Sequence, residues 1–288
     1  MVAAAEPLFP RPLLDALDQR PEQPAFEHGP RVVSCGELLA LVDRLVDGLR
    51  SVGLGPGRGV AVATGVTPEA FAAVVAVHAL GCRLVGLRPG WTAGHLAGVL
   101  GDGIDAIVAD PSTLTPELLA HAGPTTVLSL GRHPGASDLL ADARAGGPGG
   151  GGSDVAPILV EARPGDIARL NFTSGSTGRP KGCARTYRTF SLDYQTDRWA
   201  PDLARLVTHM GRFLLYRPPS FPAPLTFAGR SLLTGGTVVI PDERDLDADG
   251  QLSFVDALAR HRITGVILTV PSLQQLLARL RDHERPAG

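Results

Sequence analysis

Apolar runs of strand length alternate with amphipathic stretches of helix length along the chain. In residues 35–51, leucine and valine recur at three- and four-residue spacing, which predicts a helix with one apolar side, and Ser34 stands at its N-cap position. Glycines at 53–57 end this helix. The apolar run 60–63 then predicts a buried strand, and residues 68–80 predict a second helix.

The same alternation continues toward the end of the chain. Further strands are predicted at 83–87, 106–109, 126–130, 167–172, 213–216, 237–240 and 265–270, and further helices after Thr92, near 115–121, within 186–209, near 225–234, at 251–261 and at 272–282. Strands interleaved with helices of about 10–15 residues indicate βαβ units. The sequence therefore predicts an α/β fold of stacked βαβ subdomains with mainly parallel sheets.

A glycine-rich stretch divides the pattern near its middle. Residues 145–153, AGGPGGGGS, have the composition of a flexible linker or loop. They do not form a dinucleotide-binding fingerprint, because no apolar strand leads into them and no helix follows. We therefore predict a first βαβ subdomain over residues 1–150 and a second over residues 151–288.

Charge and hydropathy exclude two classes of partner. The 27 basic residues nearly balance the 29 acidic ones, for a net charge of −2 and a pI of about 6.4, unlike the basic surface of a dedicated nucleic-acid binder. Hydrophobic residues make up 44% of the chain, enough for a buried core, but no run reaches the ~18 apolar residues of a membrane span. We expect neither nucleic acid nor membrane as a partner.

The cysteines and histidines do not form a metal-site pattern. Cys35, Cys82 and Cys183 are widely spaced without a CxxC pair, which argues against a disulfide framework or a zinc site. The eight histidines show no metal-ligand spacing. The first residues lack the basic and apolar segments of a signal peptide. We expect a cytoplasmic protein with no metal site of its own.

The basic residues are 26 arginines and one lysine, Lys181, and the only asparagine is Asn171. A GC-rich coding bias accounts for the scarcity of both residue types. It does not account for their position, because both lie within the eleven residues 171–181.

This stretch predicts a polyphosphate cradle. A predicted buried strand leads into small, hydroxyl and basic residues, namely Thr173, Ser174, Gly175, Ser176, Thr177, Gly178 and Lys181. Small residues let backbone N–H groups approach an anion, hydroxyls add donors, and the lysine adds a point charge. A Walker A loop is excluded, because Pro180 precedes the lysine and Gly182 follows it.

Residues 172–182, FTSGSTGRPKG, resemble the signature loop of the adenylate-forming enzymes, [YF]TSG[ST]TGxPKG, at every position. Residues 74–100, 232–245 and 257–277 are similar to flanking segments of the same family. The family includes acyl- and aryl-CoA synthetases, luciferase-like ligases and the adenylation domains of nonribosomal peptide synthetases. The resemblance covers nearly the whole chain and implies the fold of the family's N-terminal domain.

The resemblance implies ATP-dependent activation of a small carboxylic acid as acyl-AMP, with release of pyrophosphate. It implies Mg²⁺ beside the ATP, and coenzyme A or the phosphopantetheine of a carrier protein as acyl acceptor. By the same resemblance, Thr173, Ser174, Gly175, Ser176, Thr177, Gly178 and Lys181 hold the β- and γ-phosphates. The Lys181 ammonium also stabilises charge as pyrophosphate leaves.

The chain departs from the family pattern in what it lacks. We find no glycine-rich adenine segment, no aromatic-Gly-x-Thr-Glu segment, no ribose-binding Asp and no C-terminal lid domain, and Lys181 leaves no second lysine for catalysis. We therefore expect an incomplete N-terminal domain, a truncated or split half that is inactive alone and completed by another chain. The alternative is a non-catalytic, degenerate adenylate-former that acts as a binding or scaffold subunit.

Residues 217–224, which we call the substrate wall, also differ from the corresponding segment in part of the family. Phe221 stands fourteen residues before Gly235, where peptide-synthetase adenylation domains carry Phe-Asp, but Pro222 occupies the Asp position. The resemblance thus disfavours an α-amino acid and favours an aryl or aliphatic acid bound by Phe221 and Pro222. Residues 217–224 are equally compatible with a rigid loop that does not contact substrate.

Overall fold

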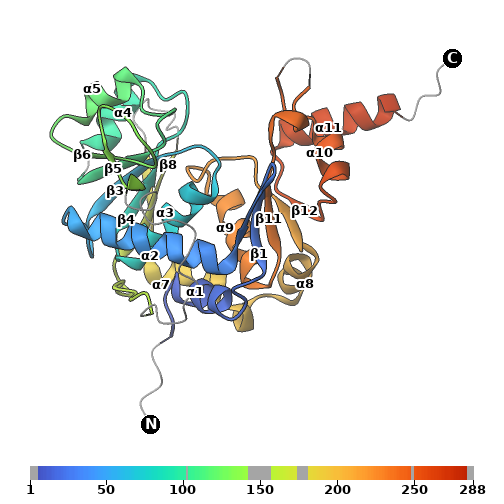
Figure 1. The fold of residues 1–288 in the computed structure, drawn as a ribbon, viewed down its shortest axis with the longest axis horizontal. Helices are drawn as coiled ribbons and strands as arrows, with labels where there is room; N and C mark the ends of the chain where they lie inside the picture. The colour runs from blue at the N-terminus through green and yellow to red at the C-terminus, as the bar shows by residue number, and fades with distance from the viewer. Residues whose placement is uncertain (1–5, 102, 142–156, 174–180, 248–249, 284–288) are drawn as a thin grey trace, which may run out of the picture.

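Two mainly parallel β-sheets organise the chain, with helices between them and on their outer sides (Figure 1). The computed structural model describes residues 6–101, 103–141, 157–173, 181–247 and 250–283. The architecture confirms the predicted α/β fold with mainly parallel sheets.

The larger sheet has seven strands. Their spatial order is β7 (Ser137–Asp138), β6 (Thr126–Ser129), β5 (Ala106–Ala109), β3 (Gly59–Ala63), β4 (Arg83–Gly86), β8 (Ile167–Thr173) and β9 (Lys181–Thr186). All neighbouring strands are parallel except β8 and β9, which form an antiparallel hairpin. The last parallel strand, β8, thus leads into the predicted phosphate loop.

The smaller sheet has five strands. Their spatial order is β12 (Gly265–Val266), β10 (Arg212–Leu214), β11 (Thr237–Ile240), β1 (Pro24–His28) and β2 (Arg31–Ser34). Only the β1–β2 pair is antiparallel in this sheet. β1 lies beside β11, so strands from both ends of the chain complete one sheet.

Ten α-helices are assigned in the described residues. They are α1 (Arg11–Asp18), α2 (Cys35–Ser51), α3 (Pro68–Ala79), α4 (Ala93–Leu100), α5 (Pro116–Ala122), α7 (Tyr187–Ser191), α8 (Pro201–His209), α9 (Pro222–Leu233), α10 (Phe254–Arg260) and α11 (Val270–His283). Short 3₁₀ turns cover 192–194, 196–198 and 243–245.

One hydrophobic cluster lies between the two sheets and contains residues of both. Val60 and Val62 of β3 and Val238 of β11 belong to one buried cluster, together with apolar residues of α1, α2, α3 and α9. The intervening strand residue Ala61 faces an outer cluster instead, as the two-residue period of a strand requires. Helix α3 is buried along its whole length because it packs in the interior layer.

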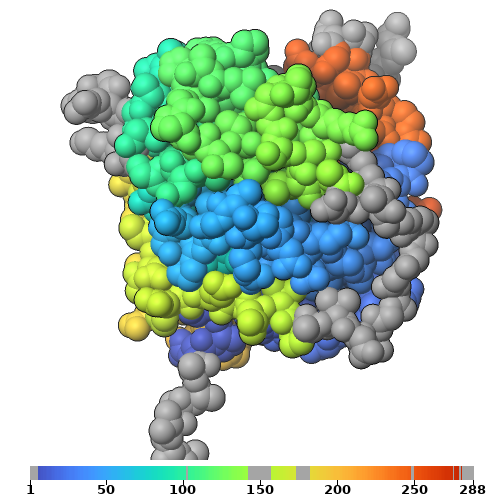
Figure 2. All heavy atoms as spheres, turned by 60° about the vertical axis from the view of Figure 1, so that its left-hand side comes forward, coloured from blue at the N-terminus to red at the C-terminus, as the bar shows by residue number. Residues whose placement is uncertain are grey.

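Separate helices cover the outer sides of the sheets. Helices α4 and α5 pack over the larger sheet, and α10 and α11 lie by the smaller one (Figure 1). The space-filling view shows α2 in blue, crossing the molecule below the green residues that include α5 (Figure 2). Among the described helices, none has the length and apolar character needed to cross a membrane.

The start of α2 follows from its sequence. The backbone N–H of Glu37 donates to Ser34 Oγ at 3.1 Å, and the backbone N–H of Ser34 donates to Glu37 Oε2 at 2.8 Å. This reciprocal capping box satisfies two N–H groups that a helix start leaves free. The predicted helix over 35–51 and its N-cap are thereby confirmed.

Each of the two sheets contains strands from both sides of residue 150. Strands β1 and β2 lie in the smaller sheet, which otherwise comes from the second half of the chain, and β8 and β9 lie in the larger one. The subdomains 1–150 and 151–288 stay a prediction about domain organisation.

Candidate functional site

The β8–β9 hairpin presents the signature loop at one edge of the larger sheet. Six residue pairs join the two strands, and the last of them places Thr173 opposite Lys181. Because β8 runs parallel to β4, the loop begins at the carboxyl ends of these strands. Ligands of open α/β sheets bind outside the carboxyl ends of the strands. The loop therefore starts where an α/β protein usually binds its ligand.

Most of the predicted cradle lies outside the described residues, namely Ser174, Gly175, Ser176, Thr177 and Gly178. The backbones of Thr173 and Lys181 are placed by the strand pairing. The hairpin thus fixes where the loop leaves the sheet and returns to it. The roles of these seven residues stay a prediction.

An aromatic contact supports the strand just before the loop. Phe172 is buried, and its ring packs edge-on against Trp91 with centroids 6.5 Å apart. The Trp91 ring stacks in turn near His95 of α4, at 6.0 Å. The segment after β4 therefore packs against the residue from which the loop departs.

The predicted substrate wall lies between β10 and α9. Phe221 is the N-terminal flanking residue of α9, and Pro222 is its first residue, where the missing N–H of proline costs no helical hydrogen bond. The wall is close to the larger sheet, since a Cβ at Gly86 would approach the Ser220 Cα to 2.5 Å. The end of β4 and the wall therefore touch backbone to backbone.

A buried arginine ties the wall to the strand of the phosphate loop. Arg169 of β8 donates from Nη2 to the Pro219 carbonyl oxygen at 2.6 Å and from Nε to Asn171 Oδ1 at 3.1 Å. Its side chain is only 1% exposed. The sequence does not single out Arg169, because a charged residue within a strand usually faces outward. The single asparagine, two residues before Thr173, is its partner.

Two further arginines pack against the wall. The guanidinium carbon of Arg217 lies 4.8 Å from the centroid of the Phe221 ring, and that of Arg88 lies 5.5 Å from it. Both distances fall in the range of cation–π attraction. The guanidinium groups of Arg88 and Arg217, from different segments, thus both lie near the Phe221 ring, next to Pro222 in the chain. Whether Phe221 and Pro222 contact a substrate stays a prediction.

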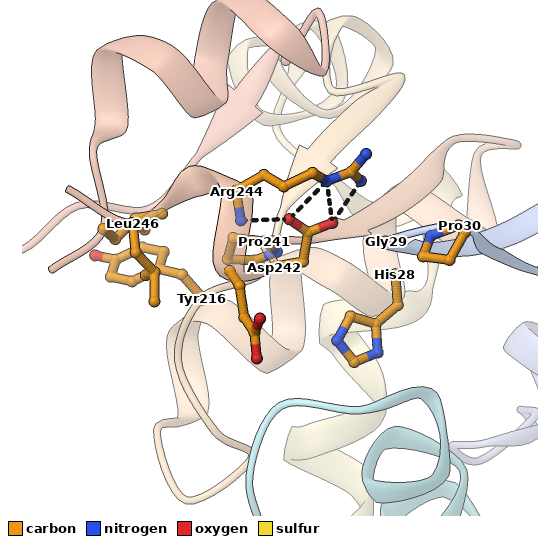
Figure 3. A pocket seen from close by; sticks show the side chains of 10 residues that line it. His28, Gly29, Pro30, Tyr216, Pro241, Asp242, Arg244 and Leu246 are labelled. Carbon is orange, nitrogen blue, oxygen red and sulfur yellow. Dashed lines mark hydrogen bonds and ion pairs between the residues drawn. The ribbon is translucent and has the colours of Figure 1, made fainter. Parts of the chain in front are cut away.

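A pocket of about 770 Å³ lies at the carboxyl ends of β1, β10 and β11 (Figure 3). It is lined by His28, Gly29, Pro30, Tyr216, Pro241, Asp242, Glu243, Arg244, Leu246 and Leu252. Arg244 donates to both carboxylate oxygens of Asp242, which lowers the pKa of that carboxyl to about 2. This pocket belongs to the smaller sheet, whereas the phosphate loop follows a strand of the larger one.

No metal site is preformed in the described part of the chain. There, no group of three or more His, Cys, Asp or Glu residues is placed to hold an ion.

Comparison with known proteins decides the family. A family model described as AMP-binding enzyme matches residues 13–287. The chain belongs to the AMP-binding enzyme family. This membership confirms the resemblance carried by the signature loop.

Two curated relatives match more than nine tenths of this chain. Nonribosomal peptide synthetase 5 of Gibberella zeae is 27% identical over 266 residues, which are 91% of this chain and 2% of the synthetase. L-Proline–[L-prolyl-carrier protein] ligase of Streptomyces coelicolor is 29% identical over 295 residues, 96% of this chain and 51% of the ligase. The chain thus spans about half of the ligase and a small part of the synthetase.

A solved structure shares the fold of this chain. The amide bond synthetase McbA from Marinactinospora thermotolerans superimposes with a TM-score of 0.71 and 28% sequence identity. The match covers 96% of this chain and 51% of McbA. About half of McbA therefore shares the fold described above.

Proposed function

We propose that this chain supplies the phosphate-binding and acid-binding sides of an ATP-dependent carboxylate activation that yields acyl-AMP and pyrophosphate. One observation carries the proposal. The strand leading into the signature loop is hydrogen-bonded, through Arg169, to the segment predicted to bind the acid. A triphosphate held by the loop and an acid held by the wall would then lie at one edge of the sheet.

Each part of the site has a definite task in this proposal. The loop residues Thr173 to Gly178 donate backbone N–H groups and hydroxyls to the β- and γ-phosphates, and Lys181 adds a compact positive charge. Bound Mg²⁺ would neutralise part of the phosphate charge. Holding both reactants in place removes most of the entropic barrier between them. A coenzyme A or carrier-protein thiol is the proposed acyl acceptor.

The proposed acid lacks an α-amino group. Pro222 has no charged side chain to pair with an ammonium group, and it occupies the first position of α9. Phe221 instead offers an aromatic surface beside it. An aryl or aliphatic acid fits this wall better than an α-amino acid.

Calorimetry of Mg-ATP binding tests the proposal. We expect Lys181→Ala to weaken the affinity at least about tenfold, because a charge-assisted contact to phosphate contributes about 1.5–3 kcal/mol. Lys181→Arg keeps the charge in a planar fork and should fall between wild type and alanine. Arg205→Gln removes an exposed arginine paired only with Asp202 and is the matched control.

Unchanged Mg-ATP affinity in Lys181→Ala would exclude the phosphate-binding role. A second outcome is that Mg-ATP binding needs Lys181 but no acid-dependent pyrophosphate exchange appears when the second half of a family relative is added. This outcome would favour a binding or scaffold subunit. Restored exchange would support the ligase.

A further inference from the structure

Three arginines from three parts of the chain converge on Pro219–Phe221. Arg169 reaches the Pro219 carbonyl oxygen from β8, Arg88 approaches the Phe221 ring from the segment after β4, and Arg217 approaches it from the segment after β10. We call Arg88, Arg169 and Arg217 the arginine cluster. Its members are brought together by the fold, since they are distant in sequence.

Among the described residues, the cluster has no acidic partner. In the part of the chain that the structure describes, none of its three guanidinium groups contacts a carboxylate. Arg169 Nη1 also has no hydrogen-bond partner among the described residues, although the side chain is almost fully buried. A buried charge without a counter-charge costs several kcal/mol. The uncompensated charge of the cluster therefore destabilises the fold unless an anion binds to it.

Two other arginines of the described residues, one buried and one half-buried, have acidic partners. Arg230 donates to Asp193 Oδ1 at 2.9 Å, and Arg212 forms two hydrogen bonds with the Glu27 carboxylate at 2.9 and 2.6 Å. The fold thus supplies a carboxylate to these two arginines, whereas half-buried Arg20 donates to the backbone carbonyl oxygens of Ala16, Leu232 and Leu233. The arginine cluster differs from Arg230 and Arg212 in lacking a carboxylate partner among the described residues beside the predicted site.

Two further observations fit a missing anion. Burial lowers the pKa of Arg169 to about 10, so the guanidinium still carries its charge at neutral pH. Ser220, between the two contacted residues, is 5% exposed, and its hydroxyl has no hydrogen-bond partner in the described part of the chain. A carboxylate accepts from guanidinium forks and from a hydroxyl at the same time.

We propose that the arginine cluster binds a second anionic group of the acid substrate, so that the substrate class is dicarboxylic acids. This inference rests on the proposed function. One carboxylate of the acid faces the phosphate loop and is activated, and the other pairs with Arg88, Arg169 and Arg217. The phosphates of the nucleotide are the other anions near this edge, and the experiment separates the two sources.

Calorimetry with matched acids tests the substrate class. The probes are butyrate, pentanoate, hexanoate and 3-methylbenzoate, each compared with the dicarboxylate that has a carboxylate in place of its methyl group: succinate, glutarate, adipate and isophthalate. We expect at least one dicarboxylate to bind ten or more times tighter than its monocarboxylate. In Arg217→Gln and Arg88→Gln this preference should fall below threefold, while the control Arg205→Gln keeps it.

Arg169→Met gives the strongest version of the test. It removes the buried charge and keeps an apolar side chain of similar length, and near-UV circular dichroism reports whether the variant folds. A folded Arg169→Met should lose the preference for the dicarboxylate. If it does not fold, Arg217→Gln and Arg88→Gln decide the result, because both side chains are only half-buried.

Two outcomes would overturn the inference. One is equal affinity of wild type for every matched pair. The other is cluster variants that weaken Mg-ATP binding and leave the acid preference unchanged, which would assign the cluster to the nucleotide. Neither outcome affects the Lys181→Ala test of Mg-ATP binding, so failure of the substrate class and failure of the proposed function are distinguishable.

Discussion

His78 illustrates how burial sets the chemistry of one side chain. It is fully buried, and its Nδ1 donates to the Val74 carbonyl oxygen at 2.7 Å. Its ring stacks on Phe190 at 5.1 Å and meets the edge of Phe9 at 5.2 Å. Burial among these rings lowers the pKa of His78 to about 3, so the folded protein holds the neutral imidazole.

This histidine makes the stability of the protein depend on pH. The unfolded chain binds a proton at His78 below a pKa of about 6.5, whereas the folded chain does not do so until about pH 3. The free energy of unfolding should therefore fall as pH drops below about 6.5, by up to about 1.4 kcal/mol per pH unit. Urea denaturation at pH 7.0, 6.0 and 5.5 measures this slope above the range where most carboxylates titrate.

The matched control is His121, whose Nδ1 also contacts the carbonyl oxygen four residues earlier but on an exposed helix. His78→Gln should flatten the pH dependence between 7.0 and 5.5, and His121→Gln should leave it as in wild type. The same slope in wild type and His78→Gln would show that His78 does not control it.

At this scale the sequence reveals some site residues and hides others. Lys181 is identifiable because it is the only lysine and ends a known signature. Arg169 is not, because nothing in Ile167–Phe172 indicates that a charged side chain points inward. Its role depends on Pro219, fifty residues away, and such contacts exist only after folding.

Elements with strong local signals were predicted well. The helix over 35–51 has a cap and an apolar side, and β3, β5 and β11 are short apolar runs bounded by turns. Several edge or polar elements were missed, namely α1, β1, β2, β7 and β9. β9 reads KGCART, without an apolar side, and it is a strand because its backbone pairs with β8. The strand conformation of β9 therefore comes from its pairing with β8 and not from a local sequence pattern.

The capping box of α2 provides a test at the scale of elements. Ser34→Ala removes the hydroxyl that accepts from Glu37 and should lower the free energy of unfolding by about 1 kcal/mol. Ser34→Thr retains a capping hydroxyl and should lose less. Chemical denaturation should show a lower midpoint with an unchanged slope, and equal midpoints for wild type and Ser34→Ala would contradict the role of the cap.

For the whole molecule, the important feature is the layer of helices shared by both sheets. Apolar residues of α2 and α3 belong to the same core as strands of the larger and the smaller sheet. Neither sheet can lose this layer without exposing the core of the other. We therefore expect the described part of the chain to unfold in one transition rather than as separate subdomains divided at residue 150.

Leu45 of α2 tests this expectation. It is fully buried in the shared core, so Leu45→Ala should cost about 2–5 kcal/mol. Trp91 reports on the larger sheet, and Trp199 lies against Arg230 of α9 beside the smaller one. In single-tryptophan proteins, Trp91→Phe and Trp199→Phe, both fluorescence signals should shift by the same amount.

Leu206→Ala is the control for the shared core, because Leu206 is 48% exposed on α8 and its loss should change stability by less than about 0.5 kcal/mol. Two separated transitions in the two single-tryptophan proteins would instead support independent subdomains.

The contact between Gly86 and Ser220 has a practical consequence for anyone who redesigns this site. Any side chain at position 86 would collide with the Ser220 backbone, so variation there pushes the wall away from the sheet instead of reshaping it. A mutagenesis library aimed at new acids should leave Gly86 unchanged. The positions to vary are Phe221, Arg88 and Arg217. Their side chains are half-buried, so they can change without displacing the backbone.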